Sequence, residues 1–169
     1  MKQLQKYWLN TVPWESVLAL NQALCQAQKT EHKPTARGYE PARQLWAASV
    51  TRNMTLAEVL EICRKCFQFA PFAFNNGNTF AAIGKTLVEE WLKTLSPVEA
   101  QIMRTTVGHY VAGMVGKKEL MTILSHFETW SSAAARPQPA SHLIEEGKNE
   151  RVPPPAAKPA PIPSIQPSH

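Results

Sequence analysis

The sequence predicts an all-α fold: a compact bundle of about six amphipathic helices with short connections, followed by a disordered Pro/Ala-rich C-terminal tail. Three observations lead to this prediction. Apolar residues recur at three- and four-residue spacing over most of the first 130 residues. Two Ser/Thr-x-x-Glu capping boxes mark helix starts. Nowhere do four or more residues alternate between apolar and polar as a half-buried strand requires.

The first segments are expected to be helical. Residues 2–10 read as a short helix with an apolar patch at Tyr7, Trp8 and Leu9. Thr11 is predicted to be the N-cap of the next helix, with Pro13 at its first position, where the missing N–H costs nothing. That helix is expected to reach about residue 27, with its inward face made by Trp14, Val17, Leu18, Asn21, Leu24 and Cys25.

The middle of the chain shows a loop and two further helices. Residues 29–39 are polar, contain Pro34 and Gly38, and predict a loop. A helix of about ten residues should follow from Pro41. Thr55 and Glu58 then form a capping box, which starts a helix that ends near residue 69 because proline at 71 disfavours helical geometry just before it. Its buried face is expected to hold Leu56, Val59, Leu60, Cys63, Cys66 and Phe67.

The last three helices follow almost without loops. Asn78 is predicted to cap a helix over residues 79–95. Ser96 and Glu99 form a second capping box, with proline at the first helical position. Glycines 113 and 116 mark the end of that helix, and a final helix is expected over residues 117–130.

Composition changes after residue 130. Nine of the fourteen prolines lie in residues 131–169. Such a segment buries too little apolar surface to offset its ordering entropy, so it is predicted to be disordered with a polyproline II bias. We therefore divide the chain into a helical domain (residues 1–130) and a tail (residues 131–169) that serves as a tether. No two of its prolines are spaced as PxxP recognition requires.

Charge and composition bound the function. The formal net charge is +5, but the basic residues are dispersed rather than clustered. Three cysteines, an odd number, do not suggest a secreted disulfide framework. No run of eighteen apolar residues predicts a membrane span, and no signal peptide is evident. We expect a cytoplasmic protein with no membrane partner.

Catalysis and metal binding are not expected. The chain contains no aspartate, which weakens the case for a hydrolytic triad or a phosphoryl-transfer site. Gly84, Lys85 and Thr86 resemble the end of a P-loop, but the preceding glycine is missing and the segment lies in a predicted helix. We expect no enzyme activity and no cofactor.

Cys63 and Cys66 form a Cys-x-x-Cys pair that leaves three alternatives open. The pair lies on an apolar stripe near the C-terminal end of its helix, whereas redox pairs use a helix N-terminus. A zinc site needs two more ligands, and Cys25, His109 and His126 have no ligand spacing. Packing in the core is the interpretation we favour, and no metal is predicted.

Residues 67–79 are the strongest functional signal. Phe67, Phe69, Phe72 and Phe74 recur at short spacing and supply more aromatic surface than a helix corner needs. The Asn/Gly run that follows predicts a tight turn into a helix; the alternative is an anion site at the free N–H groups of residues 79–81. We predict a protein-binding adaptor whose contact surface includes Phe69, Phe72, Phe74, Asn75, Asn76 and Asn78.

Nucleic-acid binding is the alternative function. Residues 98–128 predict a helical hairpin that resembles a helix-turn-helix arrangement. Its second helix offers Lys117, Lys118, Thr122 and Ser125 for contacts, but no Arg, Asn or Gln for bidentate base readout. The partner is therefore expected to be another protein, with nucleic acid as the second possibility.

Overall fold

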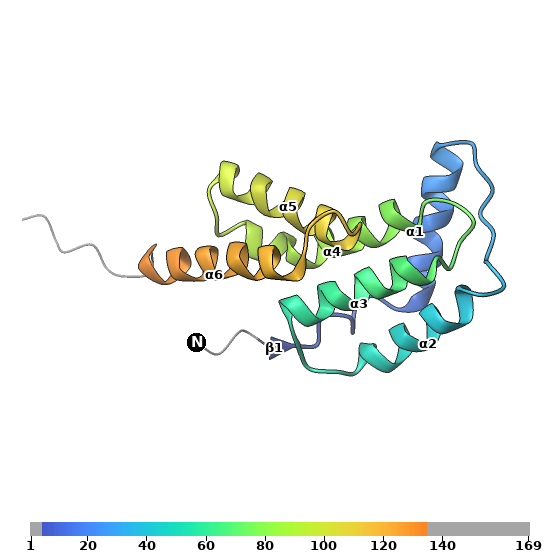
Figure 1. The fold of residues 1–169 in the computed structure, drawn as a ribbon, viewed down its shortest axis with the longest axis horizontal. Helices are drawn as coiled ribbons and strands as arrows, with labels where there is room; N and C mark the ends of the chain where they lie inside the picture. Colours follow the sequence, from blue (N-terminus) through green and yellow to red (C-terminus); the bar gives the residue numbers. More distant parts are fainter. Residues whose placement is uncertain (1–4, 135–169) are drawn as a thin grey trace, which may run out of the picture. The chain divides into compact units, whose positions relative to one another are not determined.

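A computed structural model describes residues 5–134 of the chain (Figure 1). The predicted all-α class is confirmed: six helices are joined by short connections, and one pair of two-residue strands is added in this part of the chain. In chain order the elements are β1 (Gln5–Lys6), α1 (Trp14–Ala27), α2 (Tyr39–Val50), β2 (Met54–Thr55), α3 (Leu56–Phe69), α4 (Asn76–Leu92), α5 (Pro97–Val111) and α6 (Lys117–Ala134).

The prediction of a disordered tail over residues 131–169 falls mostly outside the described residues. Only its first four positions are described, and they belong to α6, which continues to Ala134. The tail therefore stays a prediction from composition. Among the described residues, no helix combines the length and the apolar character that crossing a membrane requires.

Both predicted capping boxes are confirmed. The Glu58 N–H donates to Thr55 Oγ1 at 3.3 Å, and the Thr55 N–H donates to the Glu58 carboxylate at 2.7 Å. Ser96 and Glu99 repeat this exchange at the start of α5, with Pro97 at its first position. These bonds favour the charged carboxylate, so they lower the pKa of both glutamates. Local sequence thus determines where α3 and α5 begin.

Helix α4 lies at the centre of the packing, against α5, α3 and α1 (Figure 1). Its Gly84 allows the close approach: a Cβ there would lie 3.1 Å from Val107 Cγ1 and 3.3 Å from Leu60 Cδ2. Gly84 is therefore a packing residue in the interior of a helix, which agrees with rejecting a P-loop. The core around it holds Leu60, Ile83 and Val107.

The prediction of a helix over residues 2–10 is wrong for the part that is described. Gln5 and Lys6 pair antiparallel with Thr55 and Met54. The Trp8 indole N–H donates to the Met54 carbonyl at 2.7 Å, and both Trp8 and Leu9 are buried. Pairing with a segment far along the chain overrides the local helical pattern, which a short segment supports only weakly.

Three helix starts differ from their predicted positions. Helix α2 begins at Tyr39, two residues before the predicted Pro41. Pro13, not Thr11, is the N-cap of α1. Helix α4 begins three residues before the predicted Thr79: its N-cap is Asn75, in the left-handed conformation at φ 62°, and not Asn78. The Thr79 N–H donates to the Asn75 carbonyl at 2.9 Å. Residues 79–81 therefore lie inside the helix, and the anion-site alternative is wrong.

Candidate functional site

The corner between α3 and α4 lies beside the loop that joins α1 to α2 (Figure 1). The Thr35 N–H donates to the Pro71 carbonyl, and the Ala73 N–H donates to the Lys33 carbonyl, both at 2.8 Å. A β-bridge between Pro34 and Phe72 lies between these bonds. We call the two antiparallel strips, residues 33–38 and 69–74, the corner ribbon.

Gly38 closes one end of the corner ribbon. A Cβ on Gly38 would lie 1.9 Å from the Phe69 carbonyl oxygen and 2.6 Å from that of Ala70. The φ of Gly38 is −99°, which any residue can adopt. Glycine is therefore required here for space, because the loop backbone touches the end of α3 directly.

Asn76 holds the middle of the corner. Its Oδ1 accepts from the Phe72 N–H at 2.9 Å, and its Nδ2 donates to the Phe72 carbonyl at 2.6 Å. Asn75 uses its amide similarly, with Nδ2 donating to Thr30 Oγ1 at 3.4 Å and to the Cys25 sulfur at 3.5 Å. Two of the three asparagines predicted to bind a partner, Asn75 and Asn76, thus form hydrogen bonds within the molecule.

Asn21 of α1 holds the corner through hydrogen bonds of its side-chain amide. It is fully buried, and its Nδ2 donates to the Phe74 carbonyl and to Thr79 Oγ1, both at 2.9 Å. Its Oδ1 lies 2.7 Å from His32 Nδ1, which must carry the proton because Oδ1 is an acceptor. The sequence pattern placed Asn21 on the apolar face of this helix but indicated no role for it. The presence of one amide side chain among apolar residues on that face was the sign that it forms buried hydrogen bonds.

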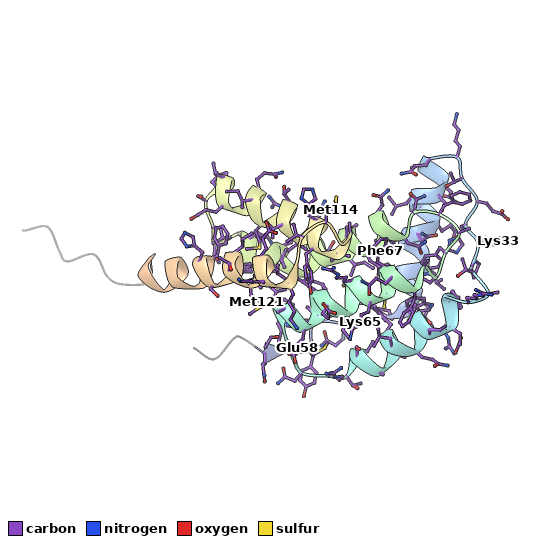
Figure 2. The ribbon with its side chains drawn as sticks, viewed as in Figure 1. Lys33, Glu58, Lys65, Phe67, Met114 and Met121 are labelled. Carbon is purple, nitrogen blue, oxygen red and sulfur yellow. The ribbon has the colours of Figure 1, made fainter. Side chains whose placement is uncertain are left out.

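The four phenylalanines of the corner have different environments. Phe72 is 1% exposed, with its ring stacked on Trp14 at 6.2 Å between centroids. Its predicted place on a partner-binding surface is therefore wrong: the aromatic core of α1 and α2 takes it up. Phe67 is half-buried (Figure 2), 3.7 Å from the position of a Cβ on Gly77. Phe69 and Phe74 remain 42% and 48% exposed.

The exposed part of the predicted surface is thus Phe69, Phe74 and Asn78. Asn78 is exposed, and its Nδ2 donates to Asn75 Oδ1 at 3.3 Å. The two exposed rings stand at opposite ends of the 69–74 strip, whose backbone is bonded to the loop, to α1 and to α4. The rings of Phe69 and Phe74 are therefore exposed to solvent on a strip whose backbone is held in place by hydrogen bonds.

The nucleic-acid candidates all lie on α6 and are exposed. Lys118, Thr122 and Ser125 share one face of the helix because they are spaced by four and three residues. The Thr122 hydroxyl donates to the Lys118 carbonyl at 3.0 Å, and the Ser125 hydroxyl donates to the Met121 carbonyl at 2.8 Å. Both hydroxyls are thus bonded to their own helix, and Lys117 and Lys118 supply the charge.

Cys63 and Cys66 are buried in the core as free thiols. Burial raises the pKa of Cys63 far above its ordinary value and raises that of Cys66 to about 12. Since the thiolate is the reactive and metal-binding form, neither redox chemistry nor metal binding is favoured here. Across residues 5–134, no three His, Cys, Asp or Glu side chains are grouped to hold a metal ion.

Glu61, Arg64 and Tyr110 form a polar cluster where α3 meets α5. The Tyr110 hydroxyl donates to the Glu61 carboxylate. The Arg64 guanidinium lies over the Tyr110 ring and donates to the Val115 carbonyl at 2.9 Å. Burial, together with the Glu61 hydrogen bond, raises the pKa of Tyr110 to about 12, so the phenol stays protonated. The cluster fastens the α5–α6 connection rather than providing a base.

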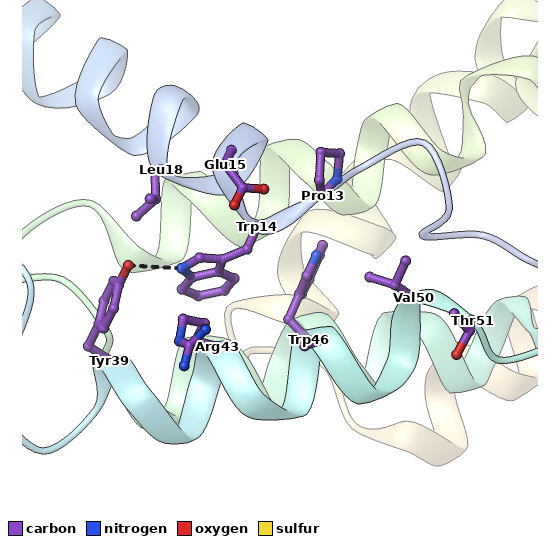
Figure 3. A pocket seen from close by; sticks show the side chains of 10 residues that line it. Pro13, Trp14, Glu15, Leu18, Tyr39, Arg43, Trp46, Val50 and Thr51 are labelled. Atoms are coloured by element: carbon purple, nitrogen blue, oxygen red, sulfur yellow. Dashed lines mark hydrogen bonds between the residues drawn. The ribbon is translucent and has the colours of Figure 1, made fainter.

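A cleft of about 530 Å³ opens between the start of α1 and α2 (Figure 3). Its floor contains Trp14 and Trp46, which are only 7% and 0% exposed. The Trp14 indole N–H already donates to the Tyr39 hydroxyl at 3.1 Å, and Arg43 is paired with Glu40 at 2.7 Å. A ligand would meet closed aromatic packing and engaged polar groups, so we assign no site to this cleft.

Comparisons with protein-family models, with curated proteins and with solved structures find no match to this chain.

Proposed function

We propose that this chain is a non-enzymatic adaptor that binds another protein through the corner ribbon. Phe69 and Phe74 are the anchors of the contact, and Asn78 lies at its edge. The observation that carries the proposal is the exposure of both rings, 42% and 48%, on a backbone held from several sides. Burying two phenylalanines against a partner gains apolar area, and aromatic residues dominate the energetics of many interfaces.

The rigidity of the ribbon strengthens this interpretation. Binding costs free energy when loops must become ordered, and a preorganised backbone avoids that cost. Here the Phe74 carbonyl accepts from Asn21, and both backbone groups of Phe72 are bonded to Asn76. The exposed rings thus extend from a strip that needs little further ordering on binding.

A second exposed apolar surface lies on α5, where Val98 and Ile102 are 70% and 48% exposed. These residues lie about one helical turn apart on α5, outside the corner ribbon. Scattered aliphatic residues of this kind are normal on protein surfaces. This pair therefore serves as the matched control for the aromatic pair.

We further propose a cytoplasmic setting for the chain and a tethering role for its tail. All three cysteines are free and buried, which suits an intracellular, cytoplasmic setting. The proline-rich residues 131–169 are proposed to act as a tether, on composition alone. Nucleic-acid binding through Lys117 and Lys118 stays the alternative, and it predicts a gel shift strongest at low salt.

Affinity capture from the native host tests the proposal. We compare tagged wild-type protein with Phe69→Ser/Phe74→Ser and with Val98→Ser/Ile102→Ser, each with and without nuclease treatment. We expect the wild type and the α5 variant to capture the same proteins and the aromatic variant to lose them. Equal capture by all three, with the fold confirmed by circular dichroism, contradicts the proposal. A partner that disappears on nuclease treatment supports the alternative.

A further inference from the structure

A basic residue of the 33–38 strip stands opposite each end of the 69–74 strip, where the exposed rings lie. Lys33 is bonded through its carbonyl to Ala73, the neighbour of Phe74. Arg37 precedes Gly38, whose backbone touches the Phe69 carbonyl. Each exposed phenylalanine therefore has a basic residue close by on the facing strip. Figure 2 places Lys33 on the outer side of the loop, and both basic residues are exposed.

The basic residues of the α1–α2 loop are not paired with carboxylates among the described residues. Lys29, Lys33 and Arg37 take part in no salt bridge within residues 5–134. Glu31 is the single carboxylate between residues 29 and 38. Most carboxylates elsewhere in this part of the chain are engaged, in ion pairs (Glu40, Glu89, Glu90), in caps (Glu58, Glu99) or with Tyr110 (Glu61).

We propose that the partner of the corner ribbon is an acidic, amphipathic protein segment, in which carboxylates stand next to apolar side chains. This inference rests on the proposed function and specifies its partner. The apolar side chains cover Phe69 and Phe74, and the carboxylates face Lys33 and Arg37. Complementary charge of this kind steers association and selects among partners more than it adds affinity.

A nucleic-acid ligand is less well matched to the same surface. Affinity for a phosphate backbone comes from neutralising several phosphates at once, and dedicated binders carry a clustered basic stripe. The loop provides three cations and one carboxylate. A protein segment with two or three carboxylates balances that charge, whereas a polynucleotide extends well beyond it.

Selection of random dodecapeptides displayed on phage tests the inference. Phage are selected on the purified wild-type chain and depleted on Phe69→Ser/Phe74→Ser, so the peptides that remain depend on the rings. We expect them to combine Asp or Glu with Leu, Ile, Val or Phe. Synthetic versions should bind the Lys33→Glu/Arg37→Glu variant about tenfold more weakly than the wild type, a loss of about 1.4 kcal/mol. Peptides with Lys in place of Glu should bind that variant better than they bind the wild type.

The outcomes separate the two proposals. Ring-dependent peptides without an excess of acid, or with unchanged affinity for Lys33→Glu/Arg37→Glu, overturn the acidic partner while the proposed function stands. The absence of any ring-dependent peptide counts against both. Binding of oligothymidylate that is lost in both the aromatic and the charge-reversed variants overturns the inference in favour of single-stranded nucleic acid. Circular dichroism of each variant confirms that it folds.

Discussion

The side-chain amide of Asn76 satisfies both backbone polar groups of Phe72: Oδ1 accepts from the N–H at 2.9 Å, and Nδ2 donates to the carbonyl at 2.6 Å. Phe72 is thereby fixed where its ring enters the aromatic core, stacked on Trp14. The neighbours that flank it, Phe69 and Phe74, are then directed outward. The buried ring of Phe72 and its hydrogen-bonded backbone thus determine that Phe69 and Phe74 are the exposed rings of the corner.

Replacing Asn76 with alanine removes both bonds and leaves the Phe72 backbone groups without these partners. We expect a loss of about 2 kcal/mol in the free energy of unfolding, since each unsatisfied buried group costs about 1–3 kcal/mol and water recovers part of it. Urea denaturation measures the change. Asn78→Ala is the control, because exposed Asn78 makes one bond of 3.3 Å, and a loss as large as that of Asn76→Ala contradicts the assignment.

Asn21→Ala disrupts a larger network. It leaves the Phe74 carbonyl, Thr79 and His32 without their shared partner, and we expect about 2–4 kcal/mol of destabilisation. Hydrogen exchange should show faster opening of the α3–α4 corner than of α5. Gln22→Ala, at the exposed position next to it on α1, should stay within about 0.5 kcal/mol of the wild type. An equal increase in hydrogen exchange at the α3–α4 corner and in α5 would contradict a local role of Asn21 at the corner.

Gly38→Ala tests the contact between the loop and α3. Its new Cβ cannot coexist with a carbonyl oxygen 1.9 Å away, so the loop must move from the corner. Overpacking of this kind costs about 1–3 kcal/mol. In Gly116→Ala the new Cβ meets nothing within 4 Å, and little change is expected. Thermal unfolding of the two variants side by side gives the comparison, and equal melting temperatures contradict the contact.

Because Cys63 and Cys66 are buried thiols, we expect the free energy of unfolding to fall at alkaline pH. Burial raises the pKa of Cys63 and Cys66 above their ordinary value of 9.0, the latter to about 12. Above pH 9 the unfolded chain therefore releases protons that the folded chain retains, and the free energy of unfolding falls as pH rises towards 12. The slope approaches about 1.4 kcal/mol per pH unit for each thiol. Urea denaturation under reducing conditions measures it.

The control for this effect is Cys63→Ala/Cys66→Ala. It should be less stable at neutral pH because buried volume is lost, but its stability should decline less steeply above pH 9. Tyr110, whose pKa is raised from 10.0 to about 12, contributes equally to both proteins. Identical slopes would show that the thiols are accessible to water.

Much of the fold could be predicted from local sequence. The starts of α3 and α5 followed from Ser/Thr–Glu pairs whose bonds form between residues three apart. The end of α3 followed from Pro71, although the chain leaves the helix through Ala70 at φ 50°. In each case the determining contacts lie within one helical turn.

Two of the errors arise where distant contacts decide the structure. Residues 5–6 pair with residues 54–55, and Trp8 bonds to Met54 across 46 positions, so no local pattern reports this. The separation of Phe72 from Phe69 and Phe74 depends on Trp14, Asn76 and the 33–38 strip. A count of phenylalanines indicated surplus aromatic surface, but only packing shows which rings provide it.

In-cell photo-crosslinking is the most direct test of the central claim, that Phe69 and Phe74 contact a protein partner. Phe74 is replaced by p-benzoylphenylalanine in one variant and Ile102 in a second, since both positions are 48% exposed. The account predicts a discrete, nuclease-resistant crosslinked product at position 74 that is absent at position 102. No product at 74, or the same product at both positions, contradicts it.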